Sequence, residues 1–123
     1  MDVRVDSGDD VVLRTADAGR VIADVFGVLD QASAGRIAEL AVALLTPDAR
    51  VLVLDLSGVT FCDSSGLSAM LSVRRRAREL GAGLAFVAVP SQLSRRIQLA
   101  GLCGVLGSYA TTGDALAAQD PSV

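Results

Sequence analysis

The feature that most constrains the fold is a run of six almost purely aliphatic residues, VLVLDL at 51–56. Such a run is typical of a central strand that is covered on at least one face. On either side of it, β-rich segments alternate with segments whose apolar residues recur at helical spacing. Because parallel strands need crossover connections, this alternation predicts an α/β domain with a mixed, mostly parallel β-sheet.

The other elements follow from periodicity and turn residues. Two β-rich runs at 11–15 and 20–26, joined by the turn sequence ADAG, predict a hairpin, and Gly27 and Asp30 are expected to end its second strand. Helices are predicted at 34–45, 63–80, 91–99 and 112–119, and further strands at 51–56, 84–89 and 105–109. The predicted order is ββαβαβαβα, with about four helices.

These elements predict one domain at 11–119, the common size for a single core. Residues 1–10 are interpreted as an N-terminal tail or an extra edge strand, and residues 120–123 as a C-terminal tail. No apolar run approaches the roughly 20 residues needed to cross a bilayer. The N-terminal sequence MDVRVDSGDD lacks the order of a signal peptide. We therefore expect a cytoplasmic protein with no membrane contact.

Missing residue types argue against most enzyme classes. The chain has no histidine, and its eleven basic residues are all arginine. Ser-His-Asp catalysis, imidazole zinc sites and lysine bases are thereby excluded. The net charge of −3 and the few aromatic residues disfavour nucleic-acid binding. We expect no catalysis, no metal, no cofactor and no small-molecule substrate.

The tetrapeptide Asp63-Ser64-Ser65-Gly66 lies where a buried strand feeds a helix. Helix N-termini attract anions, so a phosphate on a serine there would be tolerated without unfolding the domain. Asp63, and Asp30 if the two loops converge, would oppose the added charge. A serine hydroxyl there can also cap the helix, and the alternative interpretation is that the tetrapeptide is only an ordinary N-cap.

Around this tetrapeptide, the stretch VLVLDLSGVTFCDSSGLSAML resembles the signature of the STAS domain, specifically of bacterial anti-sigma-factor antagonists. Three more segments are similar to motifs of that family in the same order: FGVLD at 26–30, GAGL at 81–84 and RIQLAGL at 96–102. The resemblance covers about residues 11–118. It implies a STAS-like fold for nearly the whole chain.

The resemblance also implies a mechanism. An unphosphorylated antagonist binds an anti-sigma factor, which is a serine kinase with a histidine-kinase-like ATPase fold, and thereby frees a sigma factor. The kinase phosphorylates the serine after the aspartate, here Ser64, and a serine phosphatase resets the switch. The predicted contact residues are Asp30, Asp63, Ser65, Gly66 and Leu67. Leu67 and Met70 are expected to border a shallow apolar surface.

One departure from the family pattern leaves a second function open. Val28 stands where the family has a glutamate beside the aspartate, here Asp30. This favours a STAS protein-binding or scaffold module that is never phosphorylated. A third hypothesis, an enzyme with Ser64 or Cys62 as nucleophile, lacks a histidine or lysine to activate either group.

The two cysteines and the arginine clusters receive structural interpretations. Cys62 adjoins a helix N-terminus, a setting that can lower a thiol pKa, but both Cys62 and Cys103 are interpreted as reduced, buried or half-buried filler. A redox pair of the two remains an alternative. The arginines at 74–78 and at 95–96 are interpreted as solvated helix faces, with an acidic partner as the alternative for the first cluster.

Overall fold

A computed structural model describes residues 10–119, and its nine elements alternate as the sequence predicts. The strands are β1 (Val11–Asp17), β2 (Arg20–Leu29), β3 (Val51–Cys62), β4 (Gly83–Val87) and β5 (Ser108–Tyr109). The helices are α1 (Ala34–Val42), α2 (Ser64–Glu79), α3 (Ser91–Leu99) and α4 (Thr112–Gln119). The predicted α/β class and the order ββαβαβαβα are confirmed.

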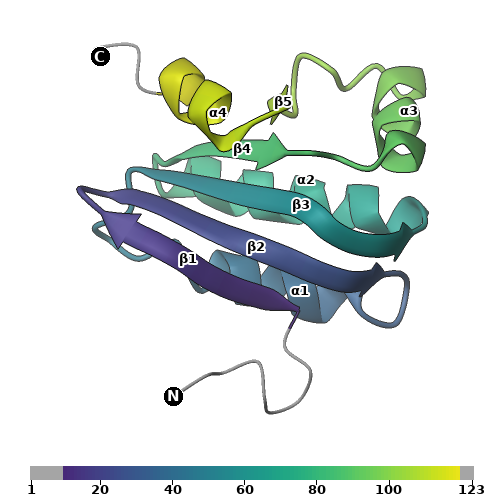
Figure 1. The fold of residues 1–123 in the computed structure, drawn as a ribbon, viewed down its shortest axis with the longest axis horizontal. Helices are drawn as coiled ribbons and strands as arrows, with labels where there is room; N and C mark the ends of the chain where they lie inside the picture. Colours follow the sequence, from purple (N-terminus) through teal and green to yellow (C-terminus); the bar gives the residue numbers. More distant parts are fainter. Residues whose placement is uncertain (1–9, 120–123) are drawn as a thin grey trace.

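The five strands form one sheet in the order β1-β2-β3-β4-β5 (Figure 1). β1 pairs with β2 in antiparallel fashion, and the other neighbours pair in parallel. The predicted hairpin and mixed sheet are thus confirmed. Residues 1–9 and 120–123 lie outside the described part of the chain, so the tails, and the domain bounds drawn from them, stay predictions.

Helices cover the two faces of the sheet unequally. α1 and α2 lie behind it in Figure 1, and their buried residues join those of α3 in the larger core, around Leu52, Phe86 and Leu93. α4 lies on the other face, where Ala115 packs with Val53 and Val87 in a smaller core. β3 is buried on both sides over residues 51–54, which explains why this stretch is an unbroken aliphatic run.

Two strands run further than predicted, and this decides where the site lies. β2 continues to Leu29 and β3 to Cys62, with irregular register where Phe26 pairs with Gly58 and Val28 with Phe61. Gly27 does not end β2, because its left-handed backbone (φ 83°) is accommodated beside one of these irregularities. The parallel pairing therefore extends up to the two loops that carry the acidic and serine residues.

The last strand is shorter than predicted. The segment before it folds into turns, in which the backbone N–H groups of Val105 and Leu106 both donate to the carbonyl of Leu102 at 3.0 Å. Leu106 is thereby buried in the larger core. Only Ser108 and Tyr109 pair with β4.

An ion-pair network ties the first three strands to α4. Arg14 contacts the carboxylates of Asp24 and Asp55, the latter at 2.7 Å, and its Nη1 donates to Thr112 Oγ1 at 3.3 Å. Asp24 and Asp55 are directly paired across β2 and β3, so the guanidinium separates two like charges. Burial tends to raise the pKa of Asp55, but hydrogen bonds from Ser57 and the Arg14 guanidinium outweigh it and hold the pKa below its ordinary value.

This depressed pKa predicts a loss of stability in acid. The folded state favours the ionised Asp55, so its contribution is present above the ordinary carboxyl pKa of about 4 and is lost as the pH falls through the lower folded pKa. We expect Asp55→Asn to reduce the loss of unfolding free energy between neutral and acidic pH. The reduction should be no more than about 1 kcal/mol, because Arg14 is partly exposed and the ion pair is therefore weakened by solvent. Urea unfolding between neutral and acidic pH measures it. The exposed Asp17→Asn on β1 is the control, and an equal effect of both variants would contradict the assignment.

Candidate functional site

The site lies where β2 and β3 end side by side. Leu29 pairs with Cys62, and the Asp63 N–H donates to the Leu29 carbonyl at 3.2 Å. Figure 1 shows the two arrowheads together at one end of the sheet. Asp30 directly follows β2, and Ser64 comes two residues after the end of β3. Both residues therefore lie at the same edge of the sheet, where sites form in open α/β sheets. The two loops thus converge, and the condition under which Asp30 would oppose a charge on Ser64 is met.

Asp63 is the N-cap of α2. Its Oδ1 accepts a hydrogen bond from the Ser65 N–H at 2.8 Å, and its backbone carbonyl accepts one from the Gly66 N–H at 3.0 Å. The tetrapeptide is thus a helix N-cap, as the alternative interpretation expects, but the capping side chain is that of Asp63 and not a serine hydroxyl. Ser64 is the first residue of the helix and Ser65 the second.

The Ser64 side chain is exposed and forms no hydrogen bond with residues 10–119. Ser65 is half-buried. No acidic or basic residue lies in the first turn of α2, so a charge on Ser64 would meet the positive end of the helix dipole and the Asp63 carboxylate first. Of the two serines, Ser64 is therefore the accessible one.

Asp30 holds the opposite loop in a fixed shape. Its Oδ1 accepts hydrogen bonds from the N–H groups of Ala32 and Ser33, both at 3.0 Å. The buried Ser33 hydroxyl accepts the Asp30 N–H at 3.0 Å and donates to the Val28 carbonyl at 2.6 Å. These bonds order the turn before α1. The other carboxylate oxygen, Oδ2, has no partner within the described chain.

Gly66 brings the first turn of α2 close to its neighbours. A Cβ at this position would lie 3.0 Å from Leu29 Cδ2 and 3.4 Å from Leu93 Cδ2. Gly66 is buried, so its role is close packing and it offers no side chain to a partner. Leu67 is half-buried and packs on the core. The expected apolar surface near Met70 is wrong, because Met70 is only 3% exposed and belongs to the core.

Two exposed apolar side chains lie near the ends of β2 and β3, at other positions than the expected Leu67 and Met70. Val28 and Phe61 are paired across β2 and β3 and are 40% and 52% exposed, whereas their neighbours Leu29 and Cys62 point into the core. Sequence reasoning missed Phe61, because the strand was expected to end at residue 56. Once β3 reaches Cys62, the burial of Cys62 places its neighbour outside.

The cysteines differ from one another. Cys62 is buried, as expected, and burial raises the pKa of its thiol, so the lowered pKa considered from the sequence is wrong. Cys103 is exposed, which corrects its interpretation as buried filler. Both are free thiols. A protonated, buried Cys62 is poorly suited to act as a nucleophile.

Residues 10–119 contain no group of three or more cysteine, aspartate or glutamate side chains placed to hold a metal ion. Over the same residues, no helix has the length and apolar character needed to cross a membrane.

The chain belongs to the STAS domain family, whose model matches residues 11–115. An anti-sigma factor antagonist from Mycobacterium paratuberculosis is 30% identical, with a TM-score of 0.73 over 88% of this chain and 91% of that one. No curated protein matches the chain.

Two more solved structures share the fold at lower identity. The anti-sigma factor antagonist SpoIIAA in its unphosphorylated form is 18% identical, with a TM-score of 0.71 over 92% of this chain and 98% of that one. A sulfate transporter family protein from Wolinella succinogenes is 19% identical, with a TM-score of 0.70 over 88% and 90% of the two chains. The fold is thus found both in antagonists and in a transporter family protein.

The capping role of Asp63 can be measured directly. We expect Asp63→Ala to lower the free energy of unfolding by about 1 kcal/mol, because the Ser65 N–H loses its acceptor. Asp63→Asn is the matched control, since its amide oxygen can accept the same bond. Ser64→Ala should change stability by less than about 0.5 kcal/mol. Urea denaturation tests all three, and a large loss in Ser64→Ala would show that the hydroxyl has a structural role.

Proposed function

We propose that this protein is an anti-sigma-factor antagonist that acts by binding, with Ser64 as the residue that switches it off. In the unphosphorylated state it binds an anti-sigma factor of the histidine-kinase-like ATPase type and so frees a sigma factor. That ATPase phosphorylates Ser64, and a serine phosphatase restores the binding state. The protein acts in the cytoplasm and catalyses no reaction of its own.

The observation that carries this proposal is that Ser64 has no structural task. Asp63 caps the helix, and the Ser64 hydroxyl stays exposed beside the positive end of the α2 dipole. Phosphorylation there would add nearly two negative charges while the cap and the packing of Gly66 stay in place. The 30% identity to an anti-sigma factor antagonist supports the same function.

The surface around Ser64 also explains how a phosphate would block binding. The proposed contact residues are Asp30, Asp63, Ser65 and Leu67, together with the exposed pair Val28 and Phe61. A neutral hydroxyl can be buried in an interface at little cost, whereas a dianion would require costly desolvation. The carboxylates of Asp30 and Asp63 would repel it further, and neither loop supplies an arginine.

A second function, a STAS scaffold module that is not phosphorylated, rests on Val28. The apolar Val28 forms a continuous exposed pair with Phe61 in place of the acidic position of the family pattern. Such a surface would still bind a partner. With Val28 in place of the family's glutamate, the loop before α1 would lack a carboxylate through which a kinase could bind it.

Phosphate transfer separates the two functions. The protein is incubated with ATP and, in turn, each histidine-kinase-like ATPase of its genome, and intact-mass spectrometry counts the phosphates. We expect one phosphate with one of these ATPases, retained in Ser65→Ala and absent in Ser64→Ala. A stable complex without phosphate transfer would instead support the scaffold module. Phosphate that persists in Ser64→Ala would contradict the assignment of the acceptor.

The exposed apolar pair should contribute to partner affinity. We expect Phe61→Ser to weaken binding to the same ATPase by about tenfold, because exposed aromatic side chains are common anchors of interfaces. Leu99→Ser on α3 is the control, since Leu99 is 78% exposed and lies on another element. Isothermal titration calorimetry compares the variants. Equal affinities of the wild type and Phe61→Ser would show that Phe61 on β3 is not part of the contact surface.

A further inference from the structure

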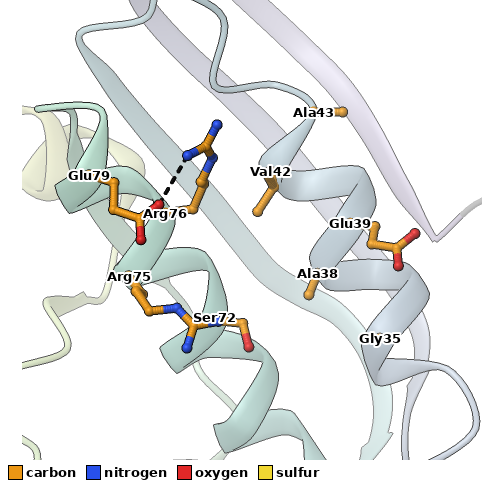
Figure 2. Close-up of a pocket in the computed structure, with 9 residues that line it drawn as sticks. All are labelled: Gly35, Ala38, Glu39, Val42, Ala43, Ser72, Arg75, Arg76 and Glu79. Atoms are coloured by element: carbon orange, nitrogen blue, oxygen red, sulfur yellow. Dashed lines mark hydrogen bonds and ion pairs between the residues drawn. The ribbon is translucent and has the colours of Figure 1, made fainter.

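A groove with a volume of about 860 Å³ runs between α1 and α2, from Gly35 and Ser72 to Ala43 and Glu79. Figure 2 shows the two helices side by side with the groove between them. Its α1 wall consists mainly of small residues: Gly35, Ala38, Val42 and Ala43. Its α2 wall is polar and charged: Ser72, Arg75, Arg76 and Glu79. The residues of each wall recur at helical spacing over about two turns, so the groove is roughly 10 Å long.

The α2 wall carries an excess of positive charge. Arg75 in this wall and Arg78, which lines the neighbouring hollow and not the groove, are exposed and form no ion pair within residues 10–119. Arg76 pairs with Glu79 at 3.0 Å, an exposed contact of small energetic value. Figure 2 shows Glu39, the acidic residue of the α1 wall, directed away from α2. The arginines therefore give this surface a positive potential, although the net charge of the whole chain is −3.

This positive charge continues around α2. A second hollow beside the groove is lined by Arg74, Arg75, Arg78 and Glu79. Arg74 is held in place there, because its Nε donates to the Val105 carbonyl at 2.9 Å. The groove and this hollow form one basic surface along the C-terminal half of α2.

Helix stability does not account for all of these arginines. Arg76 and Arg78 lie in the last turn, where the helix dipole favours cations. Arg75 lies outside that turn and is three residues from Arg78, a spacing at which like charges repel. Glu79, four residues after Arg75, offsets part of this repulsion, and an anionic partner would relieve the rest.

We infer that the groove between α1 and α2 binds an acidic segment of a partner protein. Carboxylates of that segment pair with Arg75, which lines both the groove and the adjoining hollow, and with Arg78, which lines the hollow. Its backbone lies against the small side chains of α1, which permit a close approach. A protein segment fits better than a nucleic acid, because the groove offers no aromatic side chain on which a base could stack.

This surface is separate from the proposed switch. Arg76 follows Ser64 by twelve residues of continuous helix, or roughly 18 Å. That distance exceeds the Debye length of about 8 Å at physiological salt, so a phosphate on Ser64 acts only weakly on the groove. The inference therefore does not depend on the proposed function.

The test uses the full chain, labelled with ¹⁵N, and a short oligo-glutamate peptide as the probe. We expect amide shifts confined to both walls of the groove, including Gly35, Ser72 and Arg75. Affinity should fall as salt rises, because the contacts are ionic. The double variant Arg75→Glu, Arg78→Glu should weaken binding at least about tenfold.

The control is Arg95→Glu, Arg96→Glu, which makes the same charge change on α3 and should leave the affinity within about twofold. An equal loss in both double variants would overturn the inference, as would the absence of shifts or shifts spread over the whole surface. Single-stranded DNA that binds the groove as tightly as the peptide would overturn the assignment to an acidic protein segment.

Discussion

The arrangement of the site depends on the parallel pairing of β2 and β3 at their final residues. The bond from the Asp63 N–H to the Leu29 carbonyl is the last contact of this pairing. It sets the two loops side by side, so that the turn fixed by Asp30 and the first turn of α2 share one edge of the sheet. Without this pairing, the serine and the two carboxylates would belong to separate surfaces.

Two residues with structural roles leave their neighbours available for binding. Asp63 satisfies the end of α2, and Gly66 allows that end to sit tightly on Leu29 and Leu93. Because these two residues carry the local stability, Ser64 between them presents a hydroxyl that neither caps nor packs the helix. The chemistry of the surface is thus separated from the integrity of the fold.

Much of the fold could be predicted, because alternating β-rich and helical segments leave few topologies. The hydrophobic run at 51–56 identified the central strand, and the aspartate-serine pattern located the helix start. The ends of β2 and β3 were missed, since Gly27 and Gly58 look like strand breakers and their tolerance depends on irregular pairing with a neighbouring strand. Consequently the exposure of Phe61 could not be predicted either.

The features of the site, like those of the fold, could be predicted only in part. The convergence of Asp30 and Ser64 follows from topology, which the sequence predicts well. The choice between Asp63 and a serine as the helix cap depends on backbone geometry over two residues, and the exposure of Cys103 depends on turns formed around Leu102. Such local geometry is decided by tertiary contacts that a single sequence does not display.

The absence of a structural role for the Ser64 hydroxyl has an evolutionary consequence. Since the residue contributes neither a cap nor packing, replacing it leaves the domain able to fold, and selection for folding alone would not retain it. Lineages could therefore lose or regain the switch by a single codon change while the scaffold persists. Whether position 64 keeps a hydroxyl then reports on the signalling demands placed on the protein, independently of its stability.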